Sequence, residues 1–225
     1  MAQTHTDREY EAELAHLREQ LLLMGAKVEE MMALGVRSLV ERDSELAQRV
    51  IDLDRPVDRL EMEVDEQCMR ILARRQPVAS DLRFVTSALK LVTDLERIGD
   101  LAVNVCERVL ELNEVPPLTG FEDLSAMAQE AQGMVRDALD AFVRGDADRA
   151  REVIGRDQAV DVHYNAIFAS LLAHMMDDPK NIFRTTRLQS IAKYLERTGD
   201  HATNLAEMVV FMVAREDIRH GGKQT

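Results

Sequence analysis

Apolar side chains recur along this chain at alternating intervals of four and three residues. The first series covers three heptads and consists of Tyr10, Leu14, Leu17, Leu21, Met24, Val28 and Met31. This spacing puts the apolar residues in one stripe of a helix and predicts a long amphipathic α-helix that ends near Val40. Thr6 and Glu9 have the spacing of a capping box, so we expect the helix to begin at Thr6.

The same spacing resumes over residues 46–64 and predicts a second helix that extends to about Arg75. Either Asp43 or Ser44 is expected to be its N-cap, because both side chains can accept a hydrogen bond from the first turn. Pro56 lies inside this helix and is expected to kink it, since proline has no backbone N–H to donate.

A third helix and a linker complete the first half of the chain. Pro77 breaks the second helix, and Ser80 is expected to cap a third helix that ends near Leu112. Residues 113–120 have the sequence NEVPPLTG, which is typical of a linker. We therefore predict a first three-helix domain over residues 1–113.

The order of elements then repeats. Helices are predicted over residues 121–144, 147–176 and 181–218, with Gly145 ending the first of them and Asp146 capping the second. Residues 220–225 read as a frayed tail. These helices make a second domain over residues 121–220, so the predicted fold class is all-α, with two tandem three-helix bundles.

An internal repeat supports this division. The segments LERIGDLAVNVCE (95–107) and LERTGDHATNLAE (195–207) are identical at eight of thirteen positions, at an offset of 100 residues. The segments VIDLDRPVD (50–58) and VIGRDQAVD (153–161) match at an offset of 103. Self-similarity at a fixed offset indicates duplicated structural units. The change in offset predicts a connection shorter by three residues between the second and third helices of the second half.

The third helix of the first half carries a glutamate in an otherwise apolar seam. Glu96 is followed at intervals of four residues by Asp100 and Asn104, so the three side chains lie on one side of the helix. Asp54 and Asp58 form a similar pair on the second helix. The equivalent residues of the second half are Asp157, Asp161, Glu196, Asp200 and Asn204. If the two helices are neighbours, four carboxylates meet in each half.

Such a group of carboxylates needs positive charge. Two like charges about 5 Å apart repel by roughly 3 kcal/mol at an effective dielectric constant of 20. Oxygen-rich clusters suit hard cations such as Mg²⁺, Mn²⁺ or Ca²⁺, and carboxylate-bridged iron is also compatible with a helical bundle. We therefore predict a metal site in each half. Arg97 and Arg197 offer the alternative, in which arginines pair with the carboxylates without metal.

Several neighbours of the motif bear on the site. Gly99 and Gly199 each cost about 1 kcal/mol in a helix interior relative to alanine, and they predict the close approach of a helix or ligand. The seam of the second copy contains Thr185 and Gln189, so we expect a wetter site there. His201 directly follows Asp200, and adjacent residues of a helix point in different directions. We therefore expect His201 at the surface or in contact with a metal ligand, rather than as a ligand itself.

Composition narrows the class of protein. The chain has 225 residues, 46% of them hydrophobic, and a formal net charge of −13. An acidic surface repels phosphate backbones, so no nucleic-acid partner is expected. The N-terminal sequence lacks the basic start and apolar run of a signal peptide. The longest apolar run (208–214) is too short to span a bilayer, so no direct membrane insertion is expected. Cys68 and Cys106 lack a disulfide spacing, which fits a reducing compartment. We expect a cytoplasmic protein.

Sequence fingerprints of common enzyme classes are missing. The chain has no G-x-S-x-G, no P-loop, no H-E-x-x-H and no dinucleotide-binding motif. We therefore expect a protein that is not an enzyme. Two alternatives stay open, namely a metal-dependent phosphoester hydrolase and a metal-free structural dimer.

The two motifs ERIGD (96–100) and ERTGD (196–200), with the aspartate pairs on the facing helices, resemble the PhoU family over essentially the whole chain. The resemblance implies a homodimeric negative regulator of the phosphate-starvation response. It implies that the protein couples the ATPase subunit of the phosphate ABC transporter to a sensor histidine kinase. It also implies that metal ions (Mg²⁺, Mn²⁺, Zn²⁺ or iron) bind at the acidic motifs. Pro56 departs from Ala159 in the second copy, so the two sites are expected to differ in cation affinity.

Overall fold

The computed structural model describes residues 2–118 and 122–214, and within these ranges the chain is helical with no strand. The first half contains α1 (Ala2–Glu41), α2 (Ser44–Arg75) and α3 (Ala79–Asn113). The second half contains α4 (Glu122–Arg144), α5 (Ala147–Asp177), the 3₁₀ helix η1 (Pro179–Asn181) and α6 (Ile182–Ala214). No helix of the described ranges is long and apolar enough to cross a membrane.

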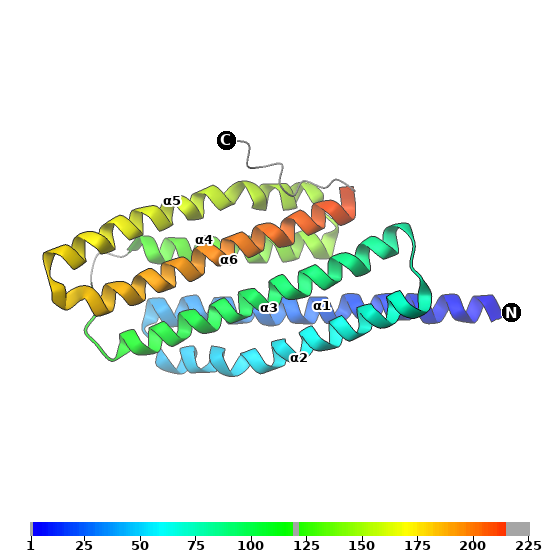
Figure 1. The fold of residues 1–225 in the computed structure, drawn as a ribbon, viewed down its shortest axis with the longest axis horizontal. Helices are drawn as coiled ribbons and strands as arrows, with labels where there is room; N and C mark the ends of the chain where they lie inside the picture. Colours follow the sequence, from blue (N-terminus) through cyan, green and yellow to red (C-terminus); the bar gives the residue numbers. More distant parts are fainter. Residues whose placement is uncertain (1, 119–121, 215–225) are drawn as a thin grey trace.

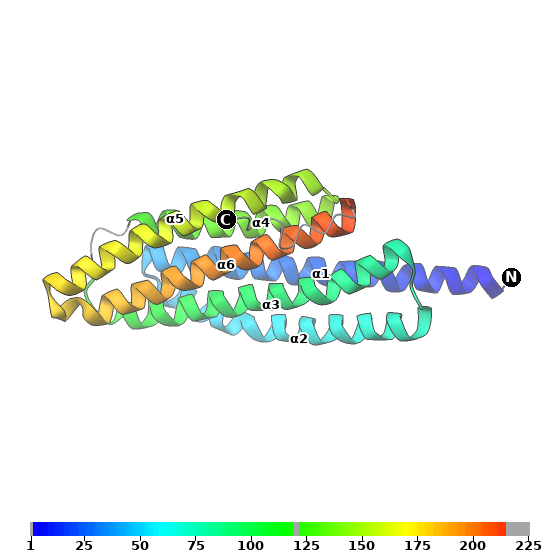
Figure 2. The same ribbon diagram turned by 45° about the horizontal axis from the view of Figure 1, so that its top comes forward.

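The helices form two three-helix bundles that lie side by side along the long axis of the molecule (Figure 1). In each bundle every helix packs against the other two. The bundles meet where α3 packs against α6 and α1 packs against α4, an arrangement that can also be followed in Figure 2. The predicted all-α fold with tandem three-helix bundles is therefore confirmed.

A single hydrophobic core runs through both halves. It includes Met31 and Val57 of the first bundle and Val160 and Ile191 of the second, all at most 1% exposed. The apolar stripes found in the sequence supply these side chains, because a helix with two apolar faces can contact neighbours in its own bundle and in the other. The predicted division at residues 113–121 therefore separates two sequence repeats that share one core.

The second helix of each bundle begins with the same cap. Asp43 Oδ1 accepts hydrogen bonds from the backbone N–H groups of Glu45 and Leu46, at 2.9 and 3.1 Å. Asp146 Oδ1 accepts from the N–H groups of Asp148 and Arg149, at 3.1 and 3.0 Å. Both predicted caps are confirmed, and the repeat extends to this local detail.

Two other predicted helix starts are wrong. α1 begins at Ala2, because residues 2–5 contain no helix breaker and the helix continues past the capping-box sequence at Thr6. α3 begins at Ala79, and its N-cap Val78 makes no side-chain capping bond. The Ser80 hydroxyl instead donates to Asp81 Oδ1 at 3.3 Å. The predicted extension of the last helix to residue 218 and the tail at 220–225 lie outside the described residues.

The change in repeat offset has a clear structural basis. α5 has 31 residues and α2 has 32. Residues 76–78 join α2 to α3, whereas Asp178 alone separates α5 from η1, which takes the place of the first turn of α3. The predicted three-residue difference is thus shared between the end of the second helix and the connection that follows it.

The segment predicted as a linker is tied to both bundles. Arg42 Nη2 donates to the backbone carbonyls of Leu112 and Val115, at 2.7 and 2.8 Å. Arg184 Nη1 of the second bundle donates to the carbonyl of Pro116 at 3.1 Å. These bonds fix where the chain crosses from one bundle to the other.

Candidate metal centre

The structure brings together carboxylates from α2 and α3, as the helical spacing predicts. The first acidic cluster consists of Asp54, Asp58, Glu61, Glu96 and Asp100, and each of these side chains is only partly exposed. Burial raises the pKa of Asp54, and the negative charges of Asp58 and Asp100 raise it further. Residues from two helices therefore share one electrostatic environment.

Glu96 is the most perturbed member of this cluster. Its side chain is 16% exposed, and its Oε2 atom is buried without a hydrogen-bond partner. Burial raises the pKa of Glu96 to about 7; Asp100 and Glu61 also raise it, while Arg97 lowers it. A buried carboxylate oxygen with spare acceptor capacity and a surplus of negative neighbours fits a cation.

Glu61 was not predicted as a member of the cluster. It follows Asp58 by three residues and so lies on the same face of α2. Burial raises its pKa, and Asp65 and Asp58 add to the shift. The pattern D-x-x-x-D-x-x-E, from Asp54 to Glu61, could have identified this residue. A comparison of the two repeats does not, because the equivalent position in the second repeat is Tyr164.

Arg97 supplies part of the neutralising charge in the first repeat. Its Nε lies 3.4 Å from Glu96 Oε2 and its Nη1 lies 3.1 Å from Asp100 Oδ2. The Arg97 side chain is 53% exposed, and exposed ion pairs contribute only about 0–1 kcal/mol. Arg97 thus offsets the charge of the cluster without filling the acceptor capacity of the buried glutamate.

The second acidic cluster consists of Asp157, Asp161, Glu196 and Asp200 on α5 and α6. Burial raises the pKa of Asp200; Glu196 and Asp161 also raise it, whereas Lys193 and His201 lower it. Asp161 and Asp200 are nonetheless more exposed to solvent than their counterparts Asp58 and Asp100. The second site is therefore the wetter one, as predicted.

Lys193 takes part in the second cluster. Its Nζ lies 2.6 Å from Glu196 Oε2 and 5.3 Å from the centroid of the Tyr164 ring. The contact with Glu196 is a close ion pair, and it raises the pKa of Lys193. Sequence reasoning considered Arg197 as the neutralising residue and missed Lys193, which lies one helical turn before Glu196.

Both predicted asparagine ligands have engaged amide groups. Asn104 Nδ2 donates to the backbone carbonyl of Asp100 at 2.8 Å. Asn204 Nδ2 donates to Asp94 Oδ1 at 3.2 Å and so links α6 to α3 of the other repeat. Only the amide oxygen of each side chain could serve a metal, and their ligand role stays a prediction.

His201 lies between the repeats rather than toward the carboxylates of its own motif. Its Nδ1 is 2.8 Å from Asp94 Oδ1, and the two side chains are 19% and 14% exposed. Together with Asp157 and Asp200 they line a groove of about 950 Å³ between α3, α5 and α6. The second acidic cluster therefore opens into a groove that the two repeats build jointly.

The motif glycines do not require glycine for steric reasons. A Cβ added to Gly99 would lie 3.6 Å from Val57 Cγ1 and 3.7 Å from Met31 Cε. A Cβ added to Gly199 would lie 3.5 Å from Val160 Cγ1. These are ordinary van der Waals distances, so side chains of neighbouring helices do lie against both glycines, as predicted, but a methyl group would fit at both positions.

The carboxylates are neighbours but are not arranged as a finished metal site. Within residues 2–118 and 122–214, no three His, Cys, Asp or Glu side chains form a group that could hold a metal ion as they stand. Any cation would have to draw the side chains of the first cluster together.

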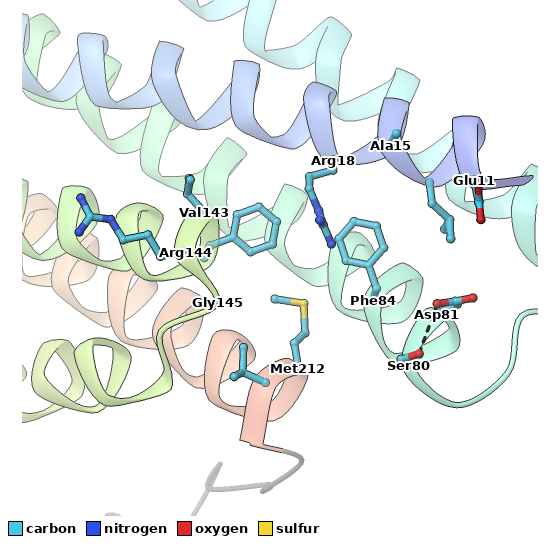
Figure 3. A pocket seen from close by; sticks show the side chains of 13 residues that line it. Glu11, Ala15, Arg18, Ser80, Asp81, Phe84, Val143, Arg144, Gly145 and Met212 are labelled. Carbon is cyan, nitrogen blue, oxygen red and sulfur yellow. Dashed lines mark hydrogen bonds between the residues drawn. The ribbon is translucent and has the colours of Figure 1, made fainter. Parts of the chain in front are cut away.

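A separate pocket lies at the end of the molecule where α3 begins and α6 ends (Figure 3). It has a volume of about 560 Å³ and is lined by residues of α1, α3, α4 and α6. The Arg18 guanidinium stacks over the Phe84 ring, 5.1 Å from its centroid, and Met212 faces them from α6. No member of either acidic cluster lines this pocket, so it is not part of the candidate metal centre.

Comparison with known proteins identifies the family. The PhoU domain matches residues 21–109 and 124–209, one match in each bundle. A phosphate-specific transport system accessory protein PhoU homolog of Pseudomonas aeruginosa is 43% identical over 219 residues, covering 97% of this chain and 90% of the relative. The accessory protein PhoU of Escherichia coli (strain K12) is 36% identical over 218 residues, covering 97% of this chain and 90% of the relative.

Solved structures agree with the sequence comparison. The crystal structure of PhoU from Pseudomonas aeruginosa superimposes with a TM-score of 0.89 at 43% identity, covering 92% of this chain and all of that chain. The phosphate transport system regulatory protein PhoU from Streptococcus pneumoniae gives a TM-score of 0.84 at 30% identity, covering 92% of this chain and 98% of that chain. The repeated acidic motifs, the tandem bundles and these matches show that the chain belongs to the PhoU family.

Proposed function

We propose that this protein is a regulatory adapter of a phosphate-specific transport system and represses the phosphate-starvation response when phosphate is plentiful. The observation that carries the proposal is the match over nearly the whole chain to proteins named as accessory or regulatory components of that system. The same names favour an adapter over the metal-dependent phosphoester hydrolase.

In this proposal the protein is a cytoplasmic homodimer with two partners. One is the ATPase subunit of the phosphate ABC transporter, and the other is a membrane-bound sensor histidine kinase. Its own role would be to pass the transport state from one partner to the other. The net charge of −13 favours basic protein surfaces over nucleic acid as contacts.

The acidic clusters would bind metal ions, with Mg²⁺, Mn²⁺, Zn²⁺ or iron as candidates. Asp54, Asp58, Glu96 and Asp100 would supply carboxylate oxygens in the first repeat, and Glu61 adds a fifth. A bound cation would neutralise the cluster and fix α2 against α3. The buried Oε2 of Glu96, which accepts no hydrogen bond and has only the Arg97 Nε at 3.4 Å beside it, supports this part of the proposal.

A metal-free structural role has its own support. Arg97 pairs with Glu96 and Asp100, and Lys193 pairs with Glu196, so each cluster already has a protein cation at hand. In that case the acidic clusters would serve packing alone. Metal analysis of gently purified protein separates the two readings, with the double variant Glu96→Ala/Glu196→Ala as the comparison.

The regulatory role can be tested by deletion. Cells that lack the gene should express phosphate-uptake genes in high phosphate, and the wild-type gene should restore repression. A Glu96→Gln/Glu196→Gln copy should fail to restore it if the clusters act in signalling. Glu19→Gln is the matched control, because Glu19 is an exposed α1 residue (77%) outside both clusters. Unchanged expression in the deletion strain would reject the role.

A further inference from the structure

The solvent-facing side of α5 carries no charged residue over residues 162–176. These fifteen residues contain no Asp, Glu, Lys or Arg, and no other stretch of the chain without these four types exceeds seven residues. Eight of the fifteen are exposed, although the chain as a whole is 31% charged. We call this surface the α5 outer face, and it consists of Val162, Asn165, Ala166, Phe168, Ala169, Leu172, Ala173 and Met176.

The α5 outer face lies on the outside of the second bundle (Figure 1). Among the described helices, α5 packs against α4, α6 and η1. Its residues Ile167 and Leu171 are buried there at 1% exposure, so this part of α5 is apolar on its inner side as well. A helix that is apolar all round is normally covered on every side. The four large side chains of the outer face are nevertheless 43–80% exposed, namely Val162, Phe168, Leu172 and Met176.

The first repeat shows that the bundle does not require apolar residues at these positions. All eight equivalent residues of α2, at the offset of 103, are exposed too. Five of them are charged, namely Arg59, Glu63, Asp65, Glu66 and Arg70. Their counterparts in α5 are Val162, Ala166, Phe168, Ala169 and Ala173. The same exposed helix face is therefore charged in one repeat and apolar in the other, which indicates that the α5 outer face binds another molecule.

Acidic side chains lie at both ends of the α5 outer face. Asp161 precedes it and Asp177 follows it, and both are exposed. Sixteen residues separate the two, which corresponds to about 24 Å along a helix. Asp178 adds a carboxylate at the second end, where Lys180 is the nearest Lys or Arg in sequence. At the first end, Arg156 is already bonded to carboxylates of α4.

These charges disfavour a second copy of the chain as the occupant. An antiparallel two-fold pairing centred on Ala169 would place Asp161 of one copy beside Asp177 of the other. A parallel pairing would place each aspartate beside its own copy. The net charge of −13 also opposes docking on an anionic lipid surface. Charge complementarity favours a partner with basic residues at both ends of its contact.

We propose that the α5 outer face docks an amphipathic helix of another protein, with apolar side chains on one face and Lys or Arg near both ends, about 24 Å apart. The inference rests on the adapter role in the proposed function, and it names the surface and the kind of segment that binds there. Phe168 and Leu172 contact the apolar side chains of the partner, while the alanines allow its backbone to approach. A single helix pair buries less area than a standard interface, which suits a partner that binds and leaves.

A synthetic helical peptide of about 20 residues tests the surface on the full-length protein. The peptide has leucine and alanine along one face and lysines near both ends, and a second peptide has glutamates in place of the lysines. The wild type should bind the lysine peptide, and the glutamate peptide should bind at least about tenfold more weakly. Phe168→Asp/Ala169→Glu should weaken binding of the lysine peptide by at least a similar factor. Asp65→Asn/Glu66→Gln, at the equivalent positions of α2, is the control.

The double variant is expected to fold, because α2 carries Asp65 and Glu66 at the equivalent exposed positions. Circular dichroism should show unchanged helicity. Leu172→Ala gives a second, uncharged variant that should also weaken binding, whereas Met69→Ala at the equivalent position of α2 should not. Equal binding of both peptides, or binding unchanged by the α5 variants, would overturn the inference. A change in the sedimentation of the α5 variants toward monomer would also overturn it and would assign the face to a second copy.

Expression of phosphate-uptake genes separates this inference from the proposed function. In the deletion strain, a Phe168→Asp/Ala169→Glu copy should fail to restore repression, and an Asp65→Asn/Glu66→Gln copy should restore it. Full repression by the α5 double variant would overturn the inference and leave the regulatory role in place. If deletion itself had no effect, the regulatory role would be rejected, and the peptide measurements would still decide whether the α5 outer face binds a basic amphipathic helix.

Discussion

His201 Nδ1 of α6 lies 2.8 Å from Asp94 Oδ1 of α3, and this polar contact joins the two repeats. Asn204 Nδ2 donates to the same oxygen at 3.2 Å. The equivalent residues of Asp94 and His201 are Tyr194 and Leu101, so the contact has no counterpart across the internal repeat. The packing of the two bundles therefore depends on residues that are not duplicated.

Loss of this contact should destabilise the protein. Asp94→Ala leaves two half-buried donors without their acceptor, and we expect the free energy of unfolding to fall by about 1–3 kcal/mol. The effect can be measured by urea denaturation, with His16→Ala as a control because His16 is 61% exposed on α1. In a double-mutant cycle, Asp94→Ala and His201→Ala should be non-additive. Additive losses would show that the two residues act independently.

The repeated caps give a second prediction. Asp43→Ala and Asp146→Ala each remove an acceptor of two backbone N–H groups, so each should lower the free energy of unfolding by about 1 kcal/mol. Asp43→Asn and Asp146→Asn should retain most of the stability, since asparagine is also a good cap. If alanine and asparagine were equally harmful, capping would not be the cause.

Glu96 should make stability depend on pH. Its pKa is raised to about 7 in the folded protein, above the ordinary value of 4.5. The folded state therefore favours the protonated form, and the contribution to stability is full below about pH 4.5 and is lost as the pH rises through 7. Without added metal, Glu96→Gln should gain stability relative to the wild type between pH 5 and 8. Thermal melting at several pH values measures this, and parallel curves for the two proteins would contradict it.

Gly99→Ala should be tolerated or stabilising. The new methyl group meets Val57 and Met31 at ordinary contact distances, and alanine is favoured over glycine in a helix by about 1 kcal/mol. We expect a small rise in the melting temperature of Gly99→Ala, and the same for Gly199→Ala. Gly145→Ala is the contrasting variant and should destabilise, because Gly145 has φ of +64°. A large loss of stability in Gly99→Ala would show that the packing against Val57 and Met31 cannot accommodate the methyl group.

Much of this protein could be read from its sequence. The three-and-four spacing of apolar residues determined the helices, because only that period places a continuous stripe on one helix face. Asp43 and Asp146 fixed two helix starts through local capping chemistry, which needs no tertiary partner. Glu96 stood out because it interrupts an apolar seam, and the structure places it half-buried among other carboxylates.

The remaining features were decided by tertiary structure. The pairing of α3 with α6 set Asp94 against His201, and nothing in the local pattern of either residue indicates that partner. Glu61 and Lys193 escaped notice because each occurs in only one repeat. Glu61 comes beside Glu96 only because α2 packs against α3, whereas Lys193 pairs with Glu196 three residues further along its own helix. Helix periodicity determines which side chains share a face, whereas the charge balance of each cluster depends on which faces meet.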